Sequence, residues 1–137
     1  MNIRKTIIMA LLLVISTMSA MAQHRIDDMM DNYSSRGTSR YTSAVERDPR
    51  TRKVLKVVNV LELNHIGISG FINAFRQDSK SGNFTEKYTE DELTLMLTVR
   101  GERQNRIYMM NCSGAYNRMQ RNTRYSKAKI TVIIKYE

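Results

Sequence analysis

The chain has 137 residues, a formal net charge of +9 and one cysteine, Cys112. A single cysteine excludes an internal disulfide, so burial and hydrogen bonding must stabilise the fold. We find no low-complexity segment and no internal repeat, and the length fits one domain preceded by a short leader.

Residues 1–22 are typical of a signal peptide. A basic start is followed by an apolar core at residues 7–15, and Ala20-Met21-Ala22 supplies small side chains at the two positions that signal peptidase reads. The apolar run is shorter than the about 20 residues that span a bilayer, and an uncleaved anchor is the alternative. We expect an exported protein, periplasmic or extracellular, with one domain at residues 23–137 and no transmembrane segment after cleavage.

Two stretches predict amphipathic helices. Residues 23–35 and residues 64–79 each place four apolar side chains at the 0, 3, 4, 7 spacing of one helical face. We expect Gly37 to end the first helix in a left-handed conformation, and Asn64 or Ser69 to cap the start of the second. The two apolar faces consist of Ile26, Met29, Met30 and Tyr33, and of Ile68, Phe71, Ile72 and Phe75.

A first hairpin is predicted with its tip at residues 48–51. Asp48 followed by Pro49 is the usual chemistry of a type I turn. Residues 41–47 favour a strand. Residues 52–63 are rich in Val and Leu, and residues 54–63 are apolar on both faces, which is typical of a strand in the interior of a sheet.

A second hairpin is predicted at residues 92–111. Its first half alternates between apolar and more polar side chains, which indicates a strand with one buried face. Gly101 tolerates a positive φ, so the chain can turn there and return as residues 107–111. The acidic connector that contains Phe84 and Tyr88 is expected to be a loop with peripheral core contacts. The buried face consists of Leu93, Leu95, Leu97 and Val99.

The remaining segment is expected to be irregular at residues 113–126 and to form a last strand at residues 128–136. The order of elements is then α-β-β-α-β-β-β. Five strands need a cover on one face, and the two amphipathic helices can supply it. The predicted fold is therefore α+β: a two-layer sandwich of a mostly antiparallel, five-stranded sheet with two helices packed on one face.

The sequence holds no recognisable catalytic or metal-binding set. It contains two histidines, His24 and His65, and no H-E-x-x-H, C-x-x-C or G-x-S-x-G motif. We expect no catalytic residue, no cofactor, no metal and no enzyme activity. A small thiol-dependent enzyme is a further hypothesis, which requires the fold to bring Cys112 and His65 together. The ordinary interpretation of Cys112 is a small buried hydrophobe.

Basic residues are the one feature above background, and nine of them form three groups that we consider as possible anion-binding residues. Export argues against nucleic acid, so the expected partners are an anionic envelope polymer, such as lipopolysaccharide phosphates or polysaccharide carboxylates, or an acidic protein. Convergence of the three groups would favour such a partner. We expect them to scatter, because three separate loops would have to coincide. The groups are Arg50, Arg52 and Lys53; Arg100, Arg103 and Arg106; and Arg118, Arg121 and Arg124.

Several short segments carry a family resemblance. Met21-Ala22-Gln23 after a leucine-rich core resembles the signal peptides of Bacteroides-type bacteria. Residues 25–34, 41–47 and 54–58 resemble a family of small exported Bacteroides proteins that is classed only as a domain of unknown function. The resemblance implies export from a Gram-negative bacterium and an α+β domain, and it implies no catalytic residue.

Taken together, these features predict a non-enzymatic, exported module that binds a partner or serves the envelope. A polyanion-binding protein that uses the arginine-rich loops is the alternative.

Overall fold

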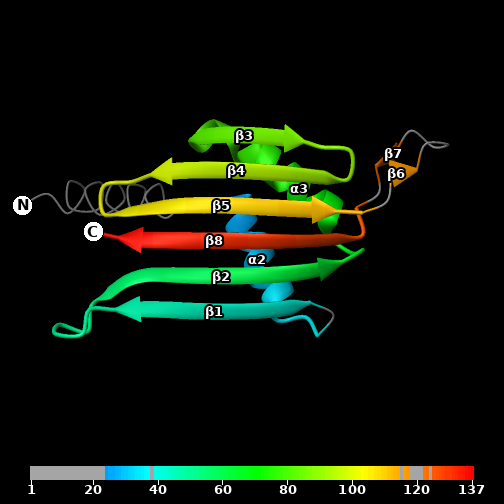
Figure 1. Cartoon of the computed structure of the whole chain (residues 1–137). Helices are drawn as coiled ribbons and strands as arrows, with labels where there is room; N and C mark the ends of the chain where they lie inside the picture. The colour runs from blue at the N-terminus through cyan, green and yellow to red at the C-terminus, as the bar shows by residue number, and fades with distance from the viewer. Residues whose placement is uncertain (1–23, 38, 115, 118–121, 124) are drawn as a thin grey trace, which may run out of the picture.

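The computed structural model of the chain describes residues 24–37, 39–114, 116–117, 122–123 and 125–137 (Figure 1). The predicted signal peptide at residues 1–22 lies outside them. The helices are α2 (Arg25–Ser34), α3 (Ile68–Asp78) and the short 3-10 helix η1 (Ser79–Ser81). The strands are β1 (Arg40–Arg47), β2 (Val54–Asn64), β3 (Asn83–Tyr88), β4 (Glu92–Arg100), β5 (Gln104–Ser113), β6 (Tyr116–Asn117), β7 (Asn122–Thr123) and β8 (Lys127–Tyr136).

Six strands form one antiparallel sheet in the order β1-β2-β8-β5-β4-β3, and α2 and α3 both lie behind it in Figure 1. The α+β class and the two helices are therefore confirmed. The two hairpins, β1–β2 and β4–β5, also form as predicted. The last strand, β8, inserts between β2 and β5, so it joins the two hairpins into a single sheet.

The prediction of five strands was wrong, because the connector expected at Phe84 and Tyr88 is the edge strand β3. An acidic residue, Glu86, lies between them on the helix side of this strand and disrupts the apolar alternation. The fold accommodates its carboxylate by an ion pair with Arg76 of α3 at 3.0 Å and by a 2.6 Å hydrogen bond from the Tyr88 hydroxyl. The segment expected to be irregular also contains the two-stranded β6–β7 ladder.

The core lies between the sheet and the two helices. Leu97 and Tyr108 of the sheet and Phe71 of α3 are completely buried. The predicted inward faces of both helices and of β4 are correct. Other buried members of the core include Ile26, Leu61, Phe75, Leu93, Leu95, Met110, Cys112, Ile130 and Val132.

The helix ends and the second turn differ from the expected capping. Gly67 occupies the N-cap position of α3 with φ +87°, and a Cβ there would lie 2.6 Å from the Tyr33 hydroxyl. The start of α3 has no side-chain cap, so the capping expected of Asn64 or Ser69 does not form. Among the glycines of the described residues Gly67 alone has a positive φ, so Gly37 is not a left-handed cap. Gly101 is needed for a different reason: a Cβ there would lie 2.8 Å from the carbonyl oxygen of Gln104.

The opposite face of the sheet, which we call the open face, carries neither helix. Its side chains follow from the strand registers, because alternate residues of each strand point to opposite faces. Cross-strand partners therefore form rows that run across the sheet, perpendicular to the strands. Leu97 and Tyr108 are one such pair on the helix side, whereas Thr98 and Ile107 are the neighbouring pair on the open face.

Candidate functional site

The open face is organised in three bands along the strands. Its centre, which we call the apolar band, is made of short rows of apolar side chains with threonines between them. All six apolar residues are half-buried except Met96, which is 38% exposed. Charged and amide side chains lie at both ends of the band. The apolar band consists of Val58, Val60, Met96, Ile107, Met109 and Ile133.

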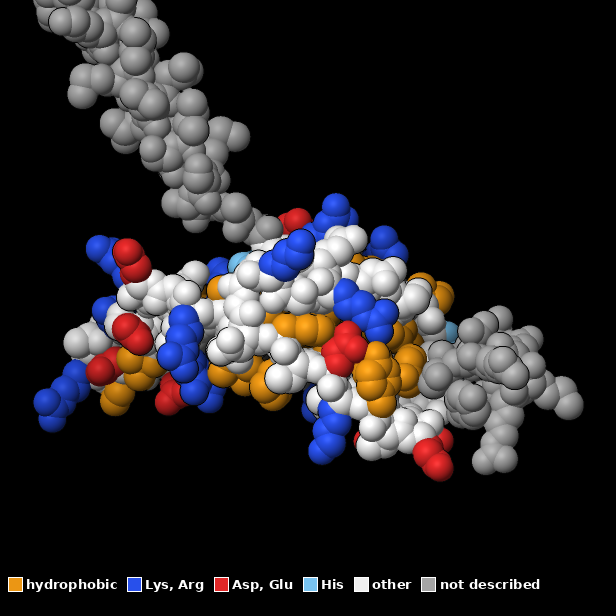
Figure 2. Space-filling view, turned by 90° about the horizontal axis from the view of Figure 1, so that it is seen from above, with side chains coloured by type: hydrophobic (Ala, Val, Ile, Leu, Met, Phe, Trp, Pro, Cys, Tyr) orange, Lys and Arg blue, Asp and Glu red, His pale blue; other side chains and the backbone are white. Residues whose placement is uncertain are grey.

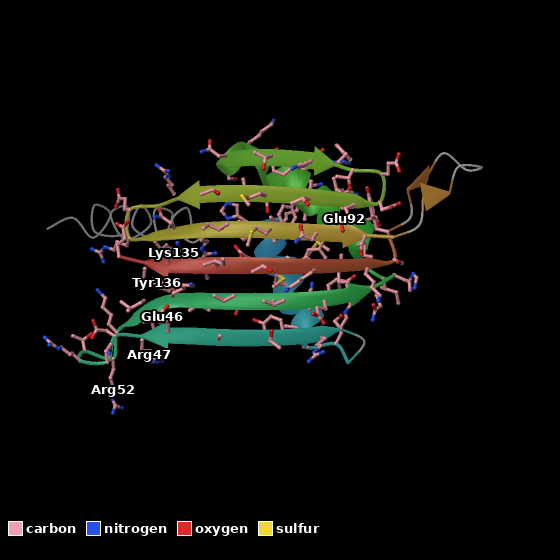
Figure 3. All side chains as sticks on the ribbon, viewed as in Figure 1. Glu46, Arg47, Arg52, Glu92, Lys135 and Tyr136 are labelled. Atoms are coloured by element: carbon pink, nitrogen blue, oxygen red, sulfur yellow. The ribbon has the colours of Figure 1, made fainter. Side chains whose placement is uncertain are left out.

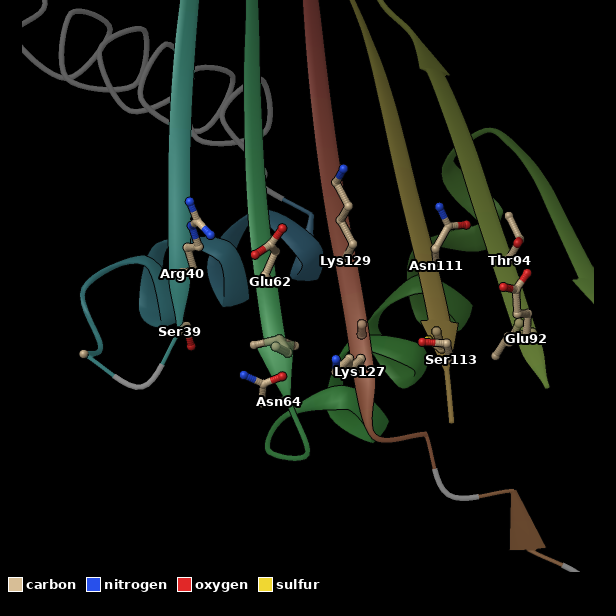
Figure 4. A pocket seen from close by; sticks show the side chains of 15 residues that line it. Ser39, Arg40, Glu62, Asn64, Glu92, Thr94, Asn111, Ser113, Lys127 and Lys129 are labelled. Atoms are coloured by element: carbon tan, nitrogen blue, oxygen red, sulfur yellow. The ribbon is translucent and has the colours of Figure 1, made fainter. Parts of the chain in front are cut away.

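At one end of the open face lies a shallow trough with a volume of about 890 Å³ (Figure 4). It crosses five strands, and its polar side chains come from two adjacent rows. The first row is Arg40, Glu62, Lys129, Asn111 and Thr94, and the second is Asn64, Lys127, Ser113 and Glu92.

The trough presents both signs of charge. Lys129 is the direct cross-strand neighbour of Glu62, yet neither side chain forms an ion pair with any carboxylate or cation of the described residues. The polar groups are therefore free to interact with water or a ligand. Because carboxylates, amides and ammonium groups alternate here, the trough suits a polar ligand with donors and acceptors better than a pure anion.

The other end of the open face is dominated by cations, and we call it the basic end. Lys56 of β2 lies directly opposite Lys135 of β8, and the same row continues through Asn105 to Arg100. Neither lysine has a carboxylate within ion-pair distance in the described part of the chain, although Glu46 is the cross-strand neighbour of Lys56. Like charges directly opposite each other destabilise a sheet by roughly 0.2–1 kcal/mol.

Both hairpin tips lie at this same end. The tip of β1–β2 carries Arg50, Arg52 and Lys53, and the tip of β4–β5 carries Arg103. Figure 3 shows Arg52 and Lys135 at the left end of the sheet, whereas Glu92 of the trough is at the right. Carboxylates are present too, and Figure 2 shows red as well as blue side chains projecting at the left end. By their positions in and next to the paired strands, the acidic residues at this end are Glu46, Asp48, Glu102 and Glu137.

One of these carboxylates is used inside its own turn. Asp48 Oδ1 accepts hydrogen bonds from the backbone N–H groups of Arg50 at 2.8 Å and Thr51 at 3.2 Å. The first of these bonds is the main cause that holds the pKa of the Asp48 carboxyl below its ordinary value. The predicted turn at residues 48–51 is therefore confirmed, and it fixes the direction in which the tip leaves the sheet.

The nine residues considered as anion ligands divide into three groups. Five exposed residues, from the β1–β2 and β4–β5 hairpins, lie at the basic end. Arg106 points to the helix side, where its Nη1 donates to Asp27 Oδ2 at 2.8 Å, so it already has an anionic partner. Arg118, Arg121 and Arg124 lie outside the described residues. The five exposed members are Arg50, Arg52, Lys53, Arg100 and Arg103.

Sequence reasoning missed the two residues that organise the basic end. Lys56 sits within an apolar run, and Lys135 is one of three lysines on the open face of β8. A signal was present for Lys135, which falls on the more polar side of the alternation in residues 128–136, but the strand that contains Lys56 is apolar on both faces. Their juxtaposition, however, depends on the pairing of β2 with β8, which no local pattern gives.

The hypothesis of a thiol-dependent enzyme finds no support in the surroundings of Cys112. The thiol belongs to the core, where burial raises its pKa to about 12, so the nucleophilic thiolate is disfavoured at neutral pH. His65 is exposed in the turn between β2 and α3. Within the described ranges, no cluster of three or more His, Cys, Asp or Glu side chains is arranged to hold a metal ion.

No helix within the described part of the chain combines the length and the apolar character needed to cross a membrane. Comparisons with models of protein families, with curated proteins and with solved structures gave no significant match. The function proposed below therefore rests on the residues of this chain.

Proposed function

We propose that this chain is an exported, non-enzymatic binding module that holds an anionic polymer against the basic end of its open face. The observation that carries this proposal is the unpaired juxtaposition of Lys56 and Lys135. Two ammonium groups on facing positions repel each other and give no structural benefit. An anion bound between them attracts both and offsets that repulsion.

The shape of the basic end favours an extended ligand over a single small anion. Its cations lie in a row across four strands, from Lys56 to Arg100, which is about 14 Å at the usual strand spacing. The hairpin tips add further cations next to this row, beyond the ends of the strands. A polymer with repeated carboxylate, sulfate or phosphate groups can contact several of these cations at once, and an acidic protein is the alternative partner.

The ligand class follows from localisation as well as charge. We propose export on the signal-peptide pattern of residues 1–22. Outside the cytoplasm, the abundant polyanions are envelope and extracellular polysaccharides rather than nucleic acid.

Mass spectrometry of the protein from its native host should give a chain that begins at Gln23. A chain that retains residues 1–22 would contradict export with cleavage.

Binding is tested with heparin as a model polyanion. The double substitution Lys56→Gln and Lys135→Gln should lower the salt concentration needed for elution from a heparin column, because fewer counterions are released on binding. Removal of the like-charge pair should leave the thermal midpoint unchanged or slightly higher.

The chain offers a matched control on the same face. The substitutions Lys127→Gln and Lys129→Gln remove the same charge from β8, at the trough end, and should change the elution salt much less. If the two double variants elute at the same lowered salt concentration, retention reflects net charge alone, and the basic end is not a binding site.

A further inference from the structure

Strand β1 is an open edge of the sheet. No described helix or strand lies beyond it in Figure 1, and seven of its eight residues are exposed, Val45 by 50%. An unpaired edge presents a row of backbone N–H and C=O groups that can pair with another strand. Natural edge strands usually carry a central lysine, a proline or a bulge that blocks such pairing. The centre of β1, from Tyr41 to Val45, contains none of these. The register of its pairing with β2 shifts only between Glu46 and Arg47, at the end of the strand.

Pairing of β1 with its own copy is restricted by symmetry. A two-fold axis between antiparallel strands must be perpendicular to the sheet, so both open faces lie on the same side. Two residues that lie opposite each other across the axis must then point to the same face of the sheet. Because alternate residues of β1 point to opposite faces, their numbers are both odd or both even, and the sum of the two numbers is even. Two such registers pair seven residues of β1: one is centred on Ser43 and the other on Ala44.

Only the register centred on Ser43 is complementary in charge. It places Arg40 opposite Glu46 of the partner subunit, and by symmetry this pair occurs twice on the open face. On the helix side it places Tyr41 against the partner's Val45, again twice. The register centred on Ala44 instead faces Glu46 with Thr42 and Tyr41 with Arg47, so it gains no opposite-charge pair.

We propose that the protein forms a symmetric homodimer through antiparallel β1–β1 pairing in the register centred on Ser43. The two six-stranded sheets then become one continuous sheet with both open faces on the same side. The trough row that starts at Arg40 runs directly into the partner's Glu46 and onward to the partner's Lys56, so each trough adjoins the basic end of the other copy.

The other edge, β3, does not offer the same complementarity. Its self-pairing centred on Glu86 brings two carboxylates together, and the register centred on Thr85 sets Phe84 against the partner's Glu86. Glu86 and Tyr88 are also engaged with Arg76. The geometry therefore assigns the dimer contact to β1.

Charge exchange tests the register. Arg40→Glu and Glu46→Arg should each convert both ion pairs to like-charge pairs and raise the dimer dissociation constant about tenfold, measured by analytical ultracentrifugation. An equimolar mixture of the two single variants should associate again, because the heterodimer restores both opposite-charge pairs. Thr85→Lys on the β3 edge should leave association of the chain unchanged.

Crosslinking tests the same register without altering charge. Facing Cα atoms at the dimer axis would lie about 4.5–5.5 Å apart, within disulfide range, and the native Cys112 is buried. Ser43→Cys should therefore give a covalent dimer under mild oxidation, whereas Ala44→Cys should crosslink far less. A wild-type protein that is monomeric at millimolar concentration would overturn the proposal. So would a dimer that is insensitive to both charge variants and that crosslinks equally well through both cysteines.

Discussion

Leu97→Ala should lower the free energy of unfolding by roughly 2–5 kcal/mol, the usual cost of truncating a fully buried leucine. Leu97 has no exposed surface and pairs with Tyr108 and Phe84 on the helix side of the sheet. Its truncation would leave a cavity between β4 and the helices. Because a domain of this size is stable by about 5–15 kcal/mol, the denaturant midpoint should fall visibly.

The neighbouring residue provides the control for this substitution. Thr98 lies on the same strand but on the open face, where it is only half-buried. Thr98→Ala should therefore change the unfolding free energy much less than Leu97→Ala. Equal losses from the two substitutions, measured by urea unfolding monitored by circular dichroism, would mean that the assignment of the two faces is incorrect.

Local patterns predicted the elements whose buried faces are regular. The 0, 3, 4, 7 spacing of α2 and α3 and the alternation of β4 are direct consequences of one-sided burial, so they can be read from the sequence. Strand β3 escaped because its inner face includes a charged residue, Glu86. The ion pair with Arg76, ten residues away, and the hydrogen bond from the Tyr88 hydroxyl make that position acceptable, and a periodicity argument cannot include such partners.

The arrangement of the basic residues could not be predicted for a topological reason. Strands β2 and β5 run in the same direction because β8 inserts between them, and this places both hairpin tips at one end of the sheet. If β5 had paired directly with β2 as an antiparallel neighbour, the tips would lie at opposite ends. The expected scatter thus depended on strand order, which is set by contacts between residues that are distant in the sequence. For the five exposed residues in the described hairpins, the structure shows clustering.

Arg106 illustrates the same limit at a single residue. By sequence it belongs with Arg100 and Arg103, but in the fold it lies on the helix side next to Asp27, which is 79 residues away. The carboxylate of Asp27 also accepts a 2.9 Å hydrogen bond from the hydroxyl of Tyr108, a residue with no exposed surface. Asp27 therefore joins the first turn of α2 to the centre of the sheet.

Asp27→Ala should accordingly destabilise the protein by about 1–3 kcal/mol, the cost of leaving a buried hydroxyl without its acceptor. Loss of the partly exposed ion pair with Arg106 should add little, because solvent screens it. Asp28→Ala is the matched control: it removes the same charge from the same first turn of α2, but from an exposed position.

Comparing the thermal unfolding of Asp27→Ala and Asp28→Ala separates the contacts of Asp27 from the helix dipole, since both substitutions remove one negative charge from the first turn of α2. A Tyr108→Phe background should reduce the cost of Asp27→Ala, because the hydroxyl that needs the carboxylate is then absent. If Asp28→Ala proved as costly as Asp27→Ala, the contribution would come from the helix terminus alone. The contact of Asp27 with Arg106 and Tyr108 would then contribute nothing measurable to the docking of α2 on the sheet.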